Sequence, residues 1–184
     1  MTNATLDKNM IELLKNLKNT KFISYECGKI FNLASGNLKI NTDKISLEIT
    51  NFLKEDLFFD ENEEFAVFEC KKSNSKFKPY CDTTLKKFGI EENIINIEII
   101  NDFISVNNGE YEFSYDQAII IKTQNKTIMF SRDVWFSEVI TISDNDNYDD
   151  VFPISEVKET FSNYGEYKVE VKRRKYSLFS WPEA

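Results

Sequence analysis

The chemistry open to this chain is limited first by a missing residue type. Its 184 residues include no histidine, which is the commonest general base, the usual partner of a serine or cysteine nucleophile and the commonest metal ligand. Ser-His-Asp hydrolases, Cys-His proteases and zinc sites are therefore excluded or strongly disfavoured. The sequence also has no glycine-rich phosphate-binding motif. Any catalysis would depend on carboxylates, lysine, tyrosine or Mg²⁺.

One spacing of carboxylates and lysine fits such chemistry. Asp60 precedes a strand-like segment that carries Glu69 and Lys71. The pattern resembles the Asp...Glu-x-Lys core of the restriction-endonuclease-like nucleases, which implies that two carboxylates would hold Mg²⁺ while the lysine positions the attacking water. The same Glu-x-Lys spacing occurs three more times between residues 156 and 172, and the acids at 60–64 would repel a nucleic-acid substrate. A Mg²⁺-dependent nuclease is therefore the alternative hypothesis.

Two acidic stretches are stronger candidates for a binding surface. The formal net charge is -8, from 31 acidic and 23 basic residues, and the basic run 172–175 leaves the rest of the chain more acidic still. We expect residues 55–64 to form a solvated loop around an aromatic plug and residues 144–150 to form an acidic loop. The second stretch fails as an EF-hand, because Tyr148 and Asp149 occupy its fifth and sixth positions and the sixth requires glycine.

The residues that we expect to contact a partner belong to these two stretches. They are Asp56, Asp60, Glu61, Glu63 and Glu64 in the first, with Asp144, Asp146, Asp149 and Asp150 in the second.

The leading hypothesis is a non-catalytic protein whose acidic surface binds and inhibits a basic protein partner. A bacterial immunity protein that neutralises a toxin, or a phage inhibitor of a host defence nuclease, would act in this way, and complementary charge would speed its association. The hypothesis includes no cofactor, no metal and no direct binding of nucleic acid. Plain solubility is the competing explanation of the acids. A third hypothesis is an assembly subunit that makes contact through the aromatic tail 176–184, and the sequence predicts no oligomeric state.

Composition indicates one folded domain, 1–184, with a possible boundary between subregions near 72–80. Hydrophobic residues make up 41% of the chain and include 16 Phe, 8 Tyr and 2 Trp, which is typical of a globular protein. No apolar run approaches the roughly 20 residues that cross a bilayer, and no secretory leader precedes Asp7, so we expect a soluble cytoplasmic protein. Cys27, Cys70 and Cys81 lack a Cys-x-x-Cys spacing, and we expect them to be reduced.

Three helices are expected from apolar periodicity and capping residues. The first begins at a Thr5 cap and runs to Leu17, and the last begins at Pro153 and ends at Gly165. A short one from Asp82 or Thr83 to Phe88 would end at Gly89.

Alternating apolar residues and turn signals predict mainly antiparallel strands. Ile119–Ile121 should be covered on both faces of a sheet, and Trp135 belongs either to the core or to a binding surface. The fold class is therefore α+β, a mainly antiparallel sheet built from hairpins, with one helix near each end of the chain. The expected strands are 22–27, 38–41, 45–51, 65–71, 94–100, 103–106, 111–115, 118–122, 127–130, 134–142 and 167–172.

Overall fold

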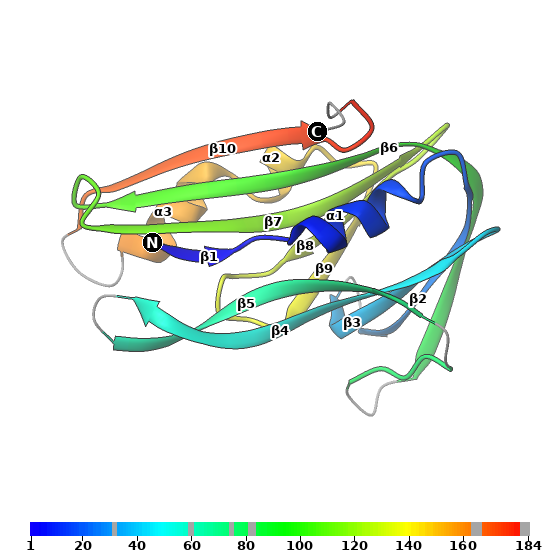
Figure 1. Ribbon diagram of the computed structural model, residues 1–184, viewed down its shortest axis with the longest axis horizontal. Helices are drawn as coiled ribbons and strands as arrows, with labels where there is room; N and C mark the ends of the chain where they lie inside the picture. The colour runs from blue at the N-terminus through cyan, green and yellow to red at the C-terminus, as the bar shows by residue number, and fades with distance from the viewer. Residues whose placement is uncertain (31–32, 59–60, 74–75, 81–83, 163–166, 181–184) are drawn as a thin grey trace.

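The computed structural model describes residues 1–30, 33–58, 61–73, 76–80, 84–162 and 167–180 (Figure 1). Most of this part of the chain is antiparallel β-sheet, so the predicted fold class is right in its main feature, although the sheet dominates more than expected and the N-terminal helix is short. In chain order the elements are β1 (Thr2–Ala4), α1 (Lys8–Lys15), β2 (Lys21–Ile30), β3 (Leu33–Thr42), β4 (Ser46–Phe58), β5 (Glu61–Lys72), β6 (Leu85–Val106), β7 (Tyr111–Thr123), β8 (Thr127–Arg132), β9 (Val139–Asp144), α2 (Tyr148–Val151), α3 (Ile154–Ser162) and β10 (Val169–Ser177).

The described strands form one sheet that closes on itself. Starting from β6, hydrogen-bonded neighbours follow in the order β7, β8, β9, β3 and β2, and β2 pairs again with β6. Three additions extend this ring: the β4–β5 hairpin continues from β3, β10 pairs with the second half of β6, and β1 lies parallel to the start of β7. The strands before and after residues 72–80 therefore belong to the same sheet.

β6 and β7 change register in their middle. Ile100 pairs with Ala118 and Asn101 pairs with Asp116, so Gln117 is the extra residue of a β-bulge. The bulge changes which face each side chain occupies, and β7 is buried on both faces as predicted for Ile119–Ile121.

Aromatic packing fills the core at the end of the sheet where β7 begins. Trp135 is 2% exposed, stacks on Phe161 of α3 at 5.5 Å between ring centroids and lies 5.1 Å from the ring of Phe65. Phe113 and Tyr115 of β7 join the same cluster. The core interpretation of Trp135 is thus confirmed.

Helix α1 confirms the predicted apolar stripe and corrects its cap. Leu6, Leu14 and Leu17 are buried, and α1 lies between β7 and the β4–β5 hairpin (Figure 1). The cap is Asp7, whose carboxylate accepts a hydrogen bond from the Met10 amide at 2.8 Å. Thr5 instead donates its hydroxyl to Asn3, because this segment is still extended beside β7.

The short helix predicted at 82–88 is wrong for the residues that the structure describes; Asp82 and Thr83 lie outside them. Leu85–Phe88 belong to β6 and pair with β2, and the Phe88 ring stacks on Tyr25 at 4.8 Å between centroids. Gly89 continues the strand instead of ending a helix. Pairing with β2, 57 to 63 residues earlier in the chain, overrides the local signals here.

Other boundaries also differ from the sequence prediction. The expected strands 94–100 and 103–106 are one strand, β6, those at 111–115 and 118–122 are one strand, β7, and β10 is Val169–Ser177 instead of 167–172. Helix α2 occupies part of the expected loop 144–150. Residues 55–58 and 61–64 are the paired ends of β4 and β5 and not a loop. The third strand of the central stretch begins at Val139, not at Val134, since the Trp135 carbonyl accepts a hydrogen bond from Ala66 across the core. Gly165, the predicted end of the last helix, lies outside the described residues.

Two further observations concern the cysteines and the membrane. Cys27 and Cys70 are buried, as expected of cysteines that act as small hydrophobic residues, and Cys81 lies outside the described residues. None of the helices in the described part of the chain has the length and apolar character that crossing a bilayer requires.

Replacing Trp135 with alanine tests the aromatic core. We expect Trp135→Ala to lower the free energy of unfolding by about 3–5 kcal/mol because it leaves a large cavity. The matched control is the neighbouring Phe136→Ala, whose ring is 49% exposed and whose loss should reduce stability by about 1 kcal/mol or less. Urea denaturation of both variants measures the difference, and equal losses would contradict this packing.

Candidate functional site

The first acidic stretch forms the tip of the β4–β5 hairpin. In its register Glu55 lies opposite Glu64 and Asp56 lies opposite Glu63, and Glu61 pairs with Phe58. Like charges directly opposite each other destabilise a sheet. The ion pairs formed between described residues include none of these acids. Asp60, the remaining predicted residue, lies outside the described part of the chain.

The hairpin tip also exposes one large apolar side chain. The Leu57 side chain is 64% exposed between the acids, while its neighbour Phe58 points inward and packs 6.0 Å from the Tyr111 ring. The carbonyl of Leu57 accepts a hydrogen bond from the Thr2 hydroxyl at 2.9 Å, which ties the tip to β1. The tip therefore presents carboxylates and one apolar side chain from a fixed backbone.

The second acidic stretch divides into exposed and engaged residues. Asp144 ends β9, and Asp146 is exposed in the turn that follows. Asp149 and Asp150 belong to α2, where Asp149 bonds to Arg173 at 2.9 Å and Asp150 accepts a hydrogen bond from Asn147 at 3.2 Å. Asp149 is thus already part of an internal ion pair.

The structure does not bring the two acidic stretches together. The hairpin tip lies beside Tyr111 at the start of β7, whereas Asp144 pairs with Ile128, which pairs with Ile121 near the other end of β7. Ten strand residues separate these positions, or about 33 Å at the usual rise. They are two separate surfaces.

The residues of the alternative nuclease site are dispersed on β5. Lys71 lies 3.8 Å from Glu69 and 3.9 Å from Glu48, and its side chain is half exposed. Asp60 lies outside the described residues, and its chain neighbour Glu61 is eight residues from Glu69 along an extended strand, about 27 Å away. Within the described residues, no three His, Cys, Asp or Glu side chains are grouped closely enough to share a metal ion.

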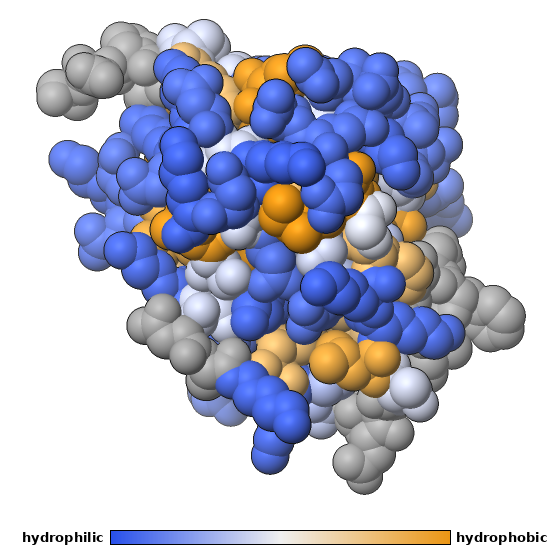
Figure 2. Space-filling model, turned by 90° about the vertical axis from the view of Figure 1, so that its right-hand side faces the viewer, coloured by the Kyte–Doolittle hydropathy of each residue, from blue (hydrophilic) through white to orange (hydrophobic). Residues whose placement is uncertain are grey.

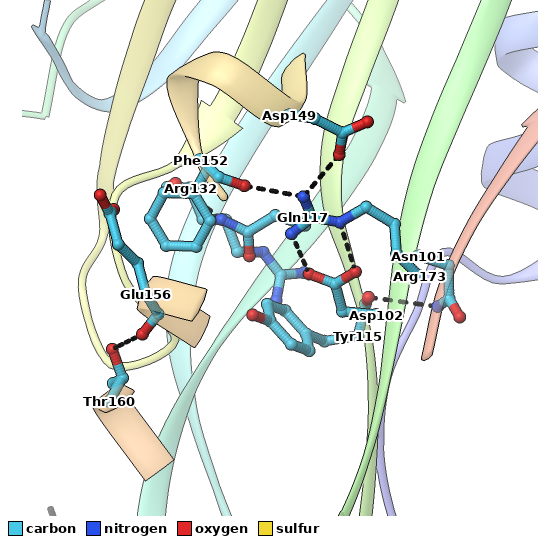
Figure 3. A network of polar contacts seen from close by, with 10 residues as sticks. All are labelled: Asn101, Asp102, Tyr115, Gln117, Arg132, Asp149, Phe152, Glu156, Thr160 and Arg173. Atoms are coloured by element: carbon cyan, nitrogen blue, oxygen red, sulfur yellow. Dashed lines mark hydrogen bonds and ion pairs between the residues drawn. The ribbon is translucent and has the colours of Figure 1, made fainter. Parts of the chain in front are cut away.

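A buried ionic network, which the sequence analysis missed, joins β6, β10 and α2. Arg173 donates two hydrogen bonds to Asp102, both at 2.8 Å, and a third to the Phe152 carbonyl at 2.7 Å (Figure 3). Its guanidinium also lies 4.6 Å from the Tyr148 ring centroid. Burial alone would lower the pKa of Arg173, but the hydrogen bonds that Arg173 donates to Asp102 outweigh this effect and raise that pKa. The basic run of β10 is therefore partly internal.

Two further buried charged residues, Arg132 and Asp116, form hydrogen bonds with the backbone of the N-terminal segment. Arg132, 1% exposed, donates to the Ala4 carbonyl at 3.0 Å, and Asp116, fully buried, accepts from the Leu6 amide at 2.7 Å. Burial lowers the pKa of Arg132 to about 10 and raises the pKa of Asp116, although the hydrogen bonds from Leu6 and Asn101 oppose the second shift. Arg132 and Asp116 each interrupt a strongly apolar strand. A charged residue in such a strand is the sequence signal from which this site could have been predicted.

Two open grooves flank β10. One, of about 530 Å³, lies against α2 and includes Tyr148, Arg173 and Lys175. The other, of about 610 Å³, lies against the N-terminal segment and includes Asp116 and Tyr176. Arg173 and Asp116, which line these grooves, already form hydrogen bonds within the protein. We therefore interpret the grooves as a result of the packing of β10 and not as a ligand site.

The predicted aromatic tail packs on its own chain as far as the structure describes it. Leu178 is buried, Phe179 packs against the same core, and the Tyr176 hydroxyl donates to Asp116 at 3.3 Å. Trp181 lies outside the described residues. The described part of the tail, 176–180, therefore packs on its own chain, and the role of an assembly contact stays a prediction.

Comparison of the chain with protein-family models, with curated proteins and with solved structures found no match. The function proposed below is therefore inferred from the geometry of the chain itself.

Breaking the Arg173–Asp102 pair should destabilise the protein strongly. We expect Arg173→Met to lower the free energy of unfolding by about 3–5 kcal/mol, because Asp102 would remain buried without its counter-ion. Arg174→Met, at the exposed next residue, should change it by less than about 0.5 kcal/mol. Urea denaturation compares the two; a small loss for Arg173→Met would mean that Asp102 is solvated.

Asp116 should give stability an unusual pH dependence. Its pKa is raised above the ordinary 3.8 in the folded state, so the folded protein holds this proton more tightly than the unfolded chain. The stabilisation that follows is complete below the ordinary pKa and is lost as the pH rises through the raised one. The unfolding free energy of the wild type minus that of Asp116→Asn should therefore fall from about pH 3 to pH 7. Denaturation at a series of pH values measures this difference, and a constant or rising difference would contradict it.

Proposed function

We propose that this protein is a non-catalytic binding protein whose β4–β5 hairpin tip docks on a basic surface of another protein and inhibits it. The observation that carries the proposal is the register of the hairpin, in which Glu55 faces Glu64 and Asp56 faces Glu63. An immunity protein for a bacterial toxin and a phage inhibitor of a defence nuclease are the two biological settings that this chemistry fits.

The like-charge pairs support a binding role because they oppose folding. Each directly opposed pair of like charges costs roughly 0.2–1 kcal/mol relative to neutral neighbours. A cationic partner would turn this repulsion into attraction, since both carboxylates of a pair could contact the same basic group. Sites that serve function commonly carry such local destabilisation.

The exposed Leu57 supports the same surface. A docking contact needs an apolar area that water leaves on binding, and charged groups around it steer the encounter. Leu57 supplies apolar area on the face of the hairpin that also carries Glu55 and Glu64. The exposed acids of the second stretch, Asp144, Asp146 and Asp150, would be a separate contact for a partner that extends along β7.

Reversing the charge of β5 alone tests the proposal. In the double variant Glu63→Lys/Glu64→Lys, each lysine faces an acid of β4, so the hairpin should gain about 0.5–2 kcal/mol of stability from two opposite-charge pairs. Binding should weaken at the same time. We expect affinity capture from the cells that make this protein to recover a basic partner with the wild type and not with this variant, and the association rate of that partner should fall at least tenfold.

The control is Asp144→Lys/Asp146→Lys, which makes the same change in net charge at the other acidic stretch and should retain the partner. The wild-type association rate should also decrease steeply with ionic strength. A partner that binds both double variants equally, or at a rate independent of salt, would overturn the proposal.

A further inference from the structure

The first half of β6 has an unpaired edge. Residues 85–93 pair with β2, whereas β7 and β10 pair with β6 only from Ile94 and Glu98 onward. No other described strand pairs with residues 85–93. The amide and carbonyl groups along such an edge are a template for a further strand.

The solvent face of this segment is partly apolar, although its pairing with β2 shifts register between Gly89 and Glu92. Every odd-numbered residue from Leu85 to Ile95 is exposed, while Phe88, Ile90 and Ile94 face inward. Leu85 and Ile95, at its two ends, are 43% and 56% exposed and are among the few large apolar side chains on the surface. Figure 2 looks onto this end of the molecule and shows hydrophobic surface between hydrophilic side chains.

The charges of this segment are arranged symmetrically about Gly89. Lys87 and Lys86 lie two and three residues before Gly89, and Glu91 and Glu92 lie two and three residues after it. When a strand of this kind pairs antiparallel with a copy of itself about Gly89, each Lys87 faces the Glu91 of the other copy. Opposite charges in that position stabilise a strand pair.

We propose that two copies of this chain associate through this edge of β6, antiparallel and centred on Gly89. The same register brings Leu85 of each copy diagonally next to Ile95 of the other, within reach of large side chains, so two exposed apolar residues are covered together with the charges. Gly89 itself leaves space for the close approach, because a Cβ placed there would meet no atom within 4 Å. The contact is isologous and closes with two copies.

The pairing is short, so the dimer is weak. Glu91 has a left-handed backbone, φ 61°, and already bonds to Lys21 at 2.7 Å. Glu92 is occupied by the Thr123 hydroxyl and the Asn125 amide. In the dimer Glu91 would be shared between Lys21 of its own chain and Lys87 of the other copy, so each charged contact adds little. A contact made by one short strand pair is smaller than a stable interface usually is, and we expect a dissociation constant in the micromolar range. This inference does not depend on the proposed function of the hairpin tip.

Sedimentation velocity across a range of concentrations tests the dimer. The wild type should shift from one to two copies over micromolar concentrations, and Lys87→Glu should raise the dissociation constant about tenfold, since it places two acids opposite each other in two symmetric contacts. The swap Lys87→Glu/Glu91→Lys should restore dimerisation. Lys158→Glu makes the same charge change at an exposed residue of α3. It should change the dissociation constant only slightly, through the net charge of the protein. A wild type that stays monomeric at every concentration would mean that Lys86 and Lys87 guard the edge instead, and would overturn the proposal.

Cross-linking tests the register. In a Cys81→Ser background, which leaves the buried Cys27 and Cys70, the variant Gly89→Cys should form a covalent dimer under mild oxidation because the two position-89 residues face each other. Lys39→Cys, on β3, should not. A dimer that forms in sedimentation but whose Gly89→Cys variant cross-links no faster than Lys39→Cys would exclude this register.

Discussion

The fold depends on β6 pairing with three strands along its length. Its first half pairs with β2 and its second half with both β7 and β10, so this single strand joins the two ends of the sheet. Backbone groups must be paired where they are buried, and here that requirement closes the sheet into a ring. The unpaired edge at the start of β6 follows from the same arrangement, because β7 leaves that edge at Ile94.

Charged side chains have different surroundings inside this ring and at the hairpin tip. Inside, Asp102 and Arg173 form a two-bond ion pair, and Asp116 and Arg132 each hold a backbone group of the N-terminal segment. Buried charges are tolerated where partners satisfy them; the Asp102–Arg173 pair meets this condition, whereas Nε and one terminal nitrogen of Arg132 make no hydrogen bond within the described part of the chain. At the hairpin tip, by contrast, carboxylates face carboxylates across the strands without a counter-ion among the described residues. The contrast between these two regions is what makes the tip a binding surface in our proposal.

The two proposed contacts lie on different parts of the surface. The hairpin tip packs beside Tyr111, and the open β6 edge begins beyond Ile94, which pairs with Thr123 at the opposite end of β7. A dimer through β6 would therefore leave both acidic tips free. Such an arrangement would present two equivalent acidic tips to basic partners.

The sequence by itself determined many of the local elements of this protein. Apolar alternation and turn signals identified most strands and the burial of Ile119–Ile121, because these depend on periodicity and on backbone conformations that few residues adopt. It also identified the acids of the first stretch, though as a loop. Only the tertiary structure decided that residues 85–88 are a strand, that the acids face each other in register, and that Arg173 and Asp116 are buried. Those features arise from pairing between segments far apart in the chain, and a single sequence carries no signal for which distant strand a segment will meet.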